Sequence, residues 1–485
     1  MPRLIIGPFN RVEGDLEVTL DVDDGVVRTA WVNSPLYRGF EQILVGKEPL
    51  DALVVAPRIC GICSVSQSVA AARALAAASN LMPPPNGLLA GDLIGACENL
   101  SDHYTHFHVF FMPDLARDAY AGRAWHAAMR ERFAAVHGSS IRAALAARAG
   151  FMKLMGYLAG KWPHTLTLQP GGSARPIEAA EKLRLSMLLG EFRSDLETRL
   201  FGDRLEAIAA IDGVAALTAW MDARAPASSD FRLFLEAAYD LELHRVGRAT
   251  DHFLSYGAYA GTQDGRLFPS GHWQAGRLAV FDVATVTEDV SHAWMNGPAE
   301  PLPPAQGVTQ PLADKTGAYT WCKAPRLAGQ VVETGALARQ VVAGHPLLVD
   351  MVTRHGGSVT ARVVARMIEL ARVLPAMEAW VKALKPGEPF CLPYARPPEE
   401  TMAVGLTEAA RGSLGHWLHI RQGRIHGYQI IAPTTWNFSP RDAAGTPGAL
   451  EQALVGLPVA AGETTPLMVQ HVVRSFDPCM VCTVH

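Results

Sequence analysis

The sequence predicts an α+β protein that is predominantly α, with a central helical bundle and small peripheral β-hairpins or sheets. Alternation of apolar and polar residues, the pattern of half-buried strands, is confined to the N-terminal region and to residues 417–432. From about residue 50 onward, Ala-rich and Leu-rich segments of helical length dominate. The chain is 49% hydrophobic and 19% charged, whereas typical globular proteins are about 25% charged, so we expect much of its surface to be buried, partly against a partner.

The N-terminal part, residues 1–50, is predicted to be β-rich. Residues 16–22 (LEVTLDV) and 26–32 (VVRTAWV) alternate on either side of a turn at Asp23-Asp24-Gly25. Residues 417–432 (WLHIRQGRIHGYQIIA) predict a second hairpin that turns at Gln422-Gly423. Both hairpins are expected at the periphery of the helical body.

The helical body is predicted to form two parts of one intertwined unit, residues 1–485. Residues 51–244 form the first part, residues 245–318 a peripheral subdomain or insertion, and residues 319–485 the second part with a C-terminal metal-binding segment. Pro/Gly-rich stretches at 81–87, 169–176, 298–308 and 385–398 separate the helices. The predicted helical segments are 64–80, 89–112, 140–159, 175–211, 229–244, 329–343 and 358–384.

Charge and targeting signals exclude several classes of partner. The formal net charge is -4 and no basic stripe is present, which argues against nucleic acid and against a membrane surface. The N-terminus lacks the apolar core of a secretory signal, and no window approaches 18 uninterrupted apolar residues, so we expect no direct membrane insertion. A cytoplasmic location is therefore expected.

Seven cysteines divide into two groups. Cys97, Cys322 and Cys391 stand alone in apolar or aromatic surroundings and are interpreted as small structural residues. The other four form two C-x-x-C pairs, Cys60 with Cys63 and Cys479 with Cys482. In a reducing compartment such pairs indicate metal ligation or redox chemistry before structural disulfides.

The position of the two pairs favours a buried metal site at the centre of the molecule. The first pair directly precedes a predicted helix, whose cap we expect to be Ser64 or Ser66, so that the helix N-terminus faces the sulfurs. A zinc site with four thiolates is the main alternative, but zinc ribbons place their pairs close together, whereas these lie at opposite ends of the chain. A thioredoxin-like role would need a βαβ context that is missing here. Ligand type alone does not distinguish nickel or iron from zinc.

A series of motifs in the same order resembles the large subunits of nickel-iron hydrogenases, from residue 11 to the last residue. This resemblance implies the fold of that family. The motifs are RVEGDLEV (11–18), YRGFEQIL (37–44), RICGIC (58–63), KWPH (161–164), YTWCKAPR (319–326), ARGSLGHW (410–417), YQIIAPTTWNFSPRD (428–442) and DPCMVCTVH (477–485).

The resemblance implies a Ni–Fe centre that reacts with H2. Cys60 and Cys479 would be terminal ligands to nickel, while Cys63 and Cys482 would bridge both metals. Iron would also carry carbon monoxide and cyanide. The family resemblance further implies maturation proteins and an iron-sulfur small subunit as partners, because no cysteine set is left in this chain for an iron-sulfur cluster.

Other matching residues would handle protons and hold the centre. Splitting H2 requires a base within reach of the proton. Glu13 matches the family's proton-relay carboxylate near Cys479, and Arg411 matches the arginine over the open side of the metals. Asp114 and Asp477 match the carboxylates expected to bind that arginine. The alternatives are a solvent-exposed strand-edge charge for Glu13 and ordinary salt bridges for the two aspartates.

A magnesium site is also implied. Glu41, His485 and the backbone carbonyl of Ile430 match the ligands of a buried Mg²⁺, a cation that prefers oxygen ligands and keeps several waters. Further histidines are interpreted as core or surface residues and not as ligands, because the thiolates already account for the metal. They are His103, His106, His108, His416 and His419.

Four substitutions depart from the pattern of most catalytic members. Gln67 stands where most have His, and a Gln amide cannot carry a proton at neutral pH. Ile62 and Phe110 replace smaller residues along the gas channel, and Ala410 replaces a proline. Gln67, Ile62 and Phe110 together resemble the regulatory branch, in which bulkier residues are thought to restrict O2 more than H2. The sequence also ends at His485 without a cleavable tail, which fits that branch and a processed chain equally.

The first hypothesis is therefore a cytoplasmic H2 sensor of low turnover that signals to a histidine kinase and controls hydrogenase gene expression. The second is an energy-converting uptake hydrogenase that feeds electrons into metabolism. The third is a structural or assembly relative without catalysis, against which the retention of all four cysteines argues.

Overall fold

The computed structural model describes residues 3–260 and 265–485, and it contains a helical body with five small antiparallel sheets. The fold is α+β and predominantly helical, as the sequence predicted. No described helix has both the length and the apolar character that a membrane crossing requires.

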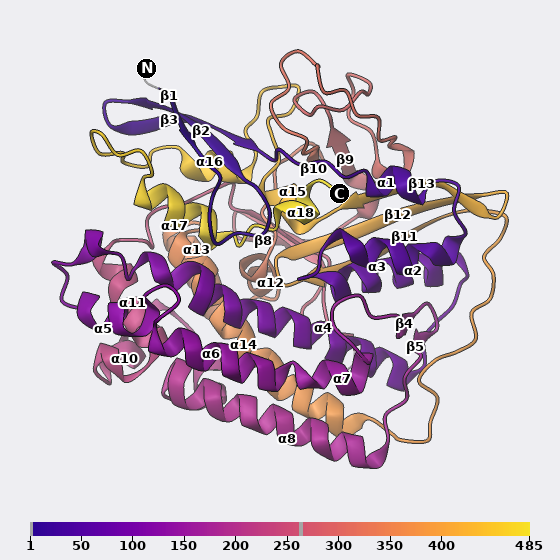
Figure 1. The fold of residues 1–485 in the computed structure, drawn as a ribbon, viewed down its shortest axis with the longest axis horizontal. Helices are drawn as coiled ribbons and strands as arrows, with labels where there is room; N and C mark the ends of the chain where they lie inside the picture. Colours follow the sequence, from indigo (N-terminus) through magenta and orange to yellow (C-terminus); the bar gives the residue numbers. More distant parts are fainter. Residues whose placement is uncertain (1–2, 261–264) are drawn as a thin grey trace.

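The helices and strands follow one another as shown in Figure 1. The helices are α1 (Phe40–Leu44), α2 (Ala52–Val55), α3 (Ser64–Ala78), α4 (Pro85–Thr105), α5 (His126–Phe133), α6 (Ser139–Phe151), α7 (Lys153–Ala159), α8 (Ala179–Asp195), α9 (Leu205–Ala209), α10 (Val214–Asp222), α11 (Asp230–Asp240), α12 (Ala336–Val342), α13 (Pro346–His355), α14 (Val359–Ala383), α15 (Pro433–Asn437), α16 (Ala449–Leu454), α17 (Leu467–Ser475) and α18 (Met480–Thr483). The strands are β1 (Arg3–Ile6), β2 (Glu17–Asp23), β3 (Val26–Asn33), β4 (Leu168–Gln169), β5 (Gly172–Ser173), β6 (His252–Ser255), β7 (Gly271–Gln274), β8 (Arg277–Ala279), β9 (Val286–Asp289), β10 (Ala324–Leu327), β11 (Glu400–Ala409), β12 (Gly412–Arg421) and β13 (Arg424–Ile431).

Four long helices, α4, α6, α8 and α14, lie side by side and form the bundle (Figure 1). The longest of them, α14, is buried along most of its length and contacts α4 and α8. A π-helical turn, His106–Phe111, continues α4 toward the C-terminal segment. The main apolar core fills the space between these helices and extends to the β1–β3 sheet.

Both predicted hairpins are confirmed, and each gains a third strand. The sheet β1-β2-β3 contains the hairpin with its turn at Asp24-Gly25, and β1 adds to its edge. The sheet β11-β12-β13 contains the second hairpin, which turns at Gln422-Gly423, while β11 pairs along the whole of β12. The alternating pattern identified the hairpins, whereas the edge strands depend on tertiary contacts.

Helix α3 packs closely on β11, and this contact positions the metal centre. A Cβ atom at Gly405 of β11 would overlap the backbone of Ala70 and Ala74 in α3. Glycine and alanine at the contact therefore let the backbone of the helix lie directly against the backbone of the strand. A second apolar cluster forms here from α3, β12, β13 and the C-terminal segment, and all four paired cysteines belong to it.

Candidate metal centre

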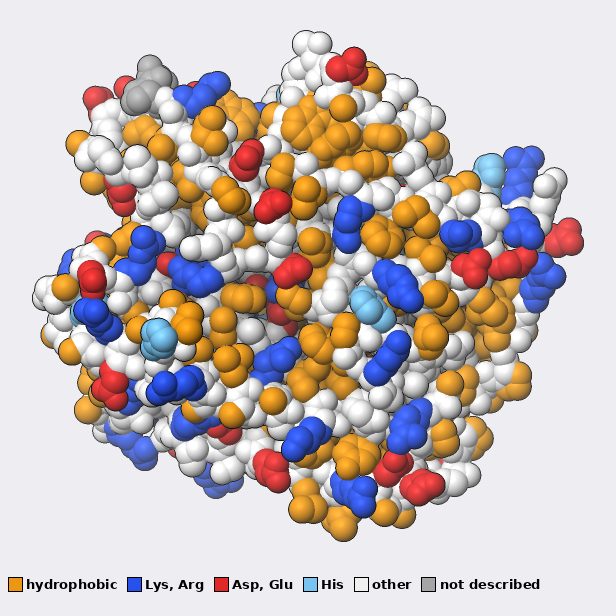
Figure 2. All heavy atoms as spheres, in the orientation of Figure 1, with side chains coloured by type: hydrophobic (Ala, Val, Ile, Leu, Met, Phe, Trp, Pro, Cys, Tyr) orange, Lys and Arg blue, Asp and Glu red, His pale blue; other side chains and the backbone are white. Residues whose placement is uncertain are grey.

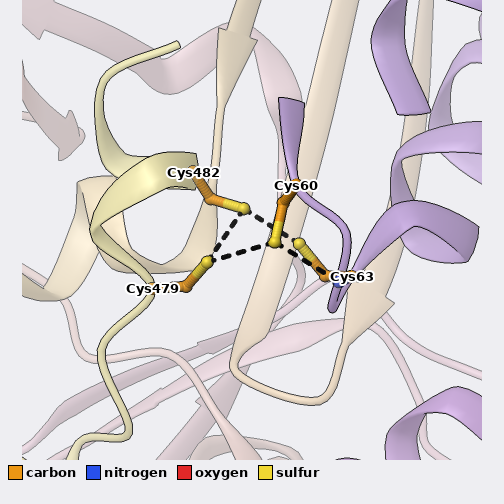
Figure 3. Close-up of side chains that lie close together, drawn as sticks. All are labelled: Cys60, Cys63, Cys479 and Cys482. Atoms are coloured by element: carbon orange, nitrogen blue, oxygen red, sulfur yellow. Dashed lines mark hydrogen bonds between the residues drawn. The ribbon is translucent and has the colours of Figure 1, made fainter. Parts of the chain in front are cut away.

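The four paired cysteines meet in one place, although they come from opposite ends of the chain (Figure 3). Their Sγ atoms all lie within 4.8 Å of one another, and all four residues are buried. The Sγ–Sγ distances are 2.9 Å for Cys63 and Cys482, 3.2 Å for Cys479 and Cys482, and 3.5 Å for Cys60 and Cys479. The closest pair, Cys63 and Cys482, is the pair expected to bridge two metals.

Local backbone structure directs these sulfurs inward. Cys60 is extended, with φ -150° and ψ 134°, after a short 3-10 helix, and Cys63 is the N-cap of α3. The backbone of Cys479 pairs with Glu13, where the Met480 amide donates to the Glu13 carbonyl at 2.7 Å. The Cys479 amide also donates to Thr434 Oγ1 at 3.1 Å. The N-terminal loop and α15 thus fix the C-terminal pair.

The pKa values of the four thiols indicate that this cluster would be stabilised by a bound cation. Hydrogen bonds from Cys479 and the neighbouring thiols hold the pKa of Cys60 well below its usual range. The pKa values of the other three thiols are raised, for Cys479 and Cys482 chiefly by burial. Without a cation the thiolate form is therefore favoured at Cys60 and disfavoured at the other three, because like charges in a buried site repel. Metal ions would supply the charge that keeps all four sulfurs as thiolates, so this donor set fits a thiolate-bound transition-metal centre.

The prediction that Ser64 or Ser66 caps the helix after the first pair was wrong. The N-terminal amides of α3 are instead capped from α4 by the carboxylate of Glu98, which accepts from Val65 N at 2.9 Å and Ser66 N at 3.0 Å. The sulfur of Cys60 accepts from the amides of Ile62 and Cys63 at 3.3 and 3.5 Å. The helix end is therefore occupied by a carboxylate, and only the loop amides face a sulfur.

Arg411 lies beside the cluster, as predicted, and Asp477 is one of its partners. Arg411 Nε donates to the Asp477 carbonyl at 2.8 Å, and Nη2 donates to Asp477 Oδ1 at 3.1 Å. The second carboxylate is Asp102 of α4, at 3.0 Å from Nη2, and not Asp114. Among the described residues, the buried Nη1 has no hydrogen-bond partner, so one donor is left for a further group in the site.

Asp114, predicted as that second carboxylate, has another role. It is buried and binds the guanidinium groups of Arg11 and Arg474, and Arg117 lies 3.7 Å away. The sequence pattern pointed to Asp114, which follows the predicted helical segment 89–112, whereas Asp102 lies inside that segment, where no motif marked it. Asp102 lies in the last turn of α4, whereas Asp114 follows the π-helical turn.

Gln67 contacts the cluster through its amide. Gln67 Nε2 donates to Cys482 Sγ at 4.0 Å, and Gln67 Oε1 lies 2.8 Å from His416 Nε2. Burial lowers the pKa of His416 to about 3, so its imidazole is neutral and donates to the amide oxygen. His416 was interpreted as a core residue; it is buried, and it also orients the Gln67 amide that donates to Cys482.

The remaining predicted site residues are Glu13, Ile62 and Phe110. Glu13 is half-buried next to Cys479, and burial followed by the charge of Cys60 raises the pKa of its carboxyl group. Ile62 lies in the loop between Cys60 and Cys63, and Phe110 belongs to the π-helical turn; both are half-buried. Their role as a gas channel stays a prediction.

The residues predicted to hold magnesium also meet. His485 Nε2 lies 3.1 Å from Glu41 Oε1, and the Ile430 amide donates to the same oxygen at 2.8 Å. Two residues that the sequence analysis missed complete this group: the Lys323 ammonium lies 3.1 Å from Glu41 and 3.4 Å from Glu288. A carboxylate pair with an imidazole fits a hard divalent cation, although the present contacts are ion pairs to Lys323.

The other cysteines and histidines lie outside the four-cysteine cluster. Cys97 and Cys322 are buried, and burial raises the pKa of each thiol, which makes them unreactive. His103 binds Glu369, and His106 binds the carbonyl of Arg474. These contacts agree with structural roles.

Fold and site together define a redox metalloprotein whose thiolate centre is built from both ends of one chain. The chain matches the family described as nickel-dependent hydrogenase over residues 38–116 and 141–485, and it belongs to that family. It is 28% identical to the Hydrogenase-2 large chain of Escherichia coli, covering 100% of this chain and 97% of that one. It is 27% identical to the uptake hydrogenase large subunit of Rhizobium leguminosarum, covering 100% and 95%.

Solved structures agree with this assignment. The structure of the Ni-Fe-Se hydrogenase from D. vulgaris Hildenborough aligns with a TM-score of 0.85 and 28% identity, with all of both chains covered. That of the Dm. baculatum [NiFeSe] hydrogenase aligns with a TM-score of 0.83 and 26% identity, again over both whole chains. The protein is thus an H2 oxidoreductase of the nickel-dependent hydrogenase family, with four cysteines at its metal centre.

Proposed function

We propose that the chain is the large subunit of an H2-oxidising hydrogenase, with a Ni–Fe centre held by Cys60, Cys63, Cys479 and Cys482. The observation that carries this proposal is the convergence of four buried sulfurs beside Arg411, whose Nη1 has no partner in the described part of the chain. The structural or assembly alternative is disfavoured, because a protein without a metal would gain nothing from keeping four thiols buried together. When bound, the centre supplies the metal chemistry that polarises and splits H2.

Glu13 is proposed to receive the proton. Its backbone pairs with that of Cys479, its carboxyl group interacts electrostatically with Cys60 and Arg411, and its raised pKa suits a group that must take up and then release a proton. Arg411 keeps its charge and has a buried Nη1 without a partner among the described residues, while Asp102 and Asp477 fix the orientation of its guanidinium group. The Nη1 donor suits a cyanide ligand on iron, which we propose together with carbon monoxide.

We also propose a Mg²⁺ held by Glu41, His485 and the carbonyl of Ile430. The support is the buried Glu41–His485 pair at the C-terminus. A cation here would anchor the last residue, which follows the second cysteine pair by only three positions.

Infrared spectroscopy of protein produced with its maturation factors tests the proposed centre. Carbonyl and cyanide stretching bands are expected, together with nickel and iron in elemental analysis. Zinc alone, with neither set of bands, would contradict the proposal. A Cys482→Ser variant is the matched control, in which the bands should be lost.

Electrons must leave through a partner, and members of this family pair with an iron-sulfur small subunit. Residues 36–54, just before the first cysteine pair, expose several large apolar side chains that would suit such a contact. They are Leu36, Ile43, Val45, Leu50 and Val54.

Of the two physiological roles predicted from the sequence, the comparisons favour the energy-converting uptake hydrogenase. The relatives cited above are named as a hydrogenase large chain and an uptake hydrogenase large subunit, and neither name indicates a sensor. The H2 sensor was the first hypothesis, and its histidine kinase partner has no support from these relatives. We therefore propose H2 uptake as the primary role.

The H2 sensor is kept as a second candidate because of one contact. The Gln67 amide binds both Cys482 and His416 where a proton-carrying histidine is usual, and this arrangement favours slow turnover. Deletion of the gene separates the two roles. Loss of H2-dependent gene expression with little loss of total hydrogenase activity would support the sensor, and the reverse would support uptake.

The cytoplasmic location is likewise a proposal. One relative, from Desulfomicrobium baculatum, is named a periplasmic [NiFeSe] hydrogenase large subunit, so the cytoplasm is not the location of every relative. Cell fractionation followed by detection of the chain tests it.

A further inference from the structure

A pocket with three arginines lies on the surface away from the four-cysteine cluster. Its volume is about 400 Å³, and its polar lining consists of Arg11, Arg117, Arg474, Asn10, Gln470 and Thr465. We call it the arginine pocket. The loop after β1, the turn after the π-helix and α17 form its walls. Figure 2 shows Lys and Arg side chains spread over this face of the molecule, with acidic side chains among them.

The arginine pocket carries an excess of positive charge. Asp114 binds Arg11 and Arg474 and lies 3.7 Å from Arg117, so one buried carboxylate serves three guanidinium groups. Asp114 is itself 1% exposed and does not line the pocket, and among the described lining residues none is acidic. Burial, with Arg11 and Arg117 nearby, lowers the pKa of Arg474 to about 10, although Asp114 opposes this.

The arginines are held in place before any ligand binds. Arg474 is 1% exposed, and its Nη2 donates to the Asn10 carbonyl at 2.9 Å and to Asn10 Oδ1 at 2.7 Å. Arg11 donates to the Phe110 carbonyl at 3.1 Å. Arg117 is the most exposed of the three and donates to Gln470 Oε1 at 3.1 Å. Fixed guanidinium groups lose little conformational entropy when they bind an anion.

We propose that the arginine pocket binds the oxyanion of a small molecule, a phosphate or a carboxylate. Guanidinium groups match the geometry of both anions. The apolar part of the lining, Ile6, Pro8, Phe9 and Pro113, would contact the body of an organic anion. The volume lies within the range of small-molecule sites, about 300–1,000 Å³.

Two short segments of the chain connect the arginine pocket to the metal centre. Arg11 is two residues before Glu13, and Arg474 is five residues before Cys479. An anion bound by Arg11 and Arg117, beside the buried Arg474, would therefore lie against both the N-terminal loop and the C-terminal segment. The anion site itself does not depend on the proposed H2 chemistry.

Calorimetric titration of the assembled, metal-loaded protein with sodium phosphate, and separately with sodium succinate, tests the proposal at constant ionic strength. Saturable binding of either anion, one per chain, is expected. Arg117→Gln should weaken it about tenfold, the loss of one charge-assisted hydrogen bond. Arg123→Gln is the matched control: Arg123 is similarly exposed, but it pairs with Asp240 and does not line the pocket.

Three results would overturn the proposal: no saturable binding of either anion, equal weakening in both variants, or binding that only follows ionic strength. H2 turnover measured on the same samples separates this result from the proposed function, since Arg117→Gln leaves the groups at the metal centre in place.

Discussion

Replacing Asp102 and Asp114 one at a time by Asn separates the carboxylate that acts at the metal centre from the one that holds the fold. Asp102 contacts Arg411, whereas Asp114 contacts Arg11 and Arg474. Both are buried, and Asn keeps the shape while it removes the charge. The two variants should therefore fail in different assays.

For Asp102→Asn we expect a loss of turnover with little loss of stability. The 3.0 Å bond to Arg411 would become a bond to a neutral oxygen, which costs about 1–1.5 kcal/mol, or roughly tenfold in rate if it acts in the transition state. Burial raises the pKa of Asp102 to about 6, against the attraction of Arg411. The ionised carboxylate is therefore a net cost to folding above pH 6, which Asn would remove.

For Asp114→Asn we expect the opposite result. Two buried guanidinium groups would lose their carboxylate, and removing one partner of a buried ion pair costs about 3–5 kcal/mol. Turnover of the surviving protein should stay near the wild-type rate. The assays are H2-dependent dye reduction and denaturant-induced inactivation of the assembled protein. The placement of these carboxylates would be refuted if Asp114→Asn abolished turnover without loss of stability while Asp102→Asn kept both its turnover and its stability.

Three further predictions concern the surroundings of the metal centre. Gln67→His should raise H2 turnover and sensitivity to O2, both measured by dye reduction before and after exposure to air. The control is Gln67→Asn, which offers no proton carrier. Equal rates in the two variants would count against the role of the amide. Burial raises the pKa of Glu98 to about 7. Its contribution to the free energy of unfolding, about 3 kcal/mol, is therefore present below pH 4.5 and is lost as the pH rises through 7. Glu98→Gln should flatten that part of the stability curve measured by denaturant unfolding, and an unchanged pH dependence would contradict it. Glu41→Gln should lower bound magnesium in elemental analysis to well below one per chain, while Glu288→Gln should lower it less; full magnesium in the Glu41 variant would exclude the proposed site.

Part of the fold and site followed from the sequence because it depends on local patterns. Alternation predicted the two hairpins, and the Ala-rich run after Cys63 predicted α3 nearly to its ends. The two C-x-x-C pairs predicted the four-cysteine cluster, because thiolates that bind one metal site must lie close together even when they come from opposite ends of the chain. The motif resemblance carried the identity, which the family match confirmed.

The tertiary structure decided which distant side chains meet. The cap of α3 comes from Glu98, the second partner of Arg411 is Asp102, and the orientation of Gln67 depends on His416. Each of these contacts joins residues that are far apart in sequence, so no local pattern could select them from other candidates of the same type. A helix presents several polar residues at similar spacing, and only packing determines which of them faces the metal centre.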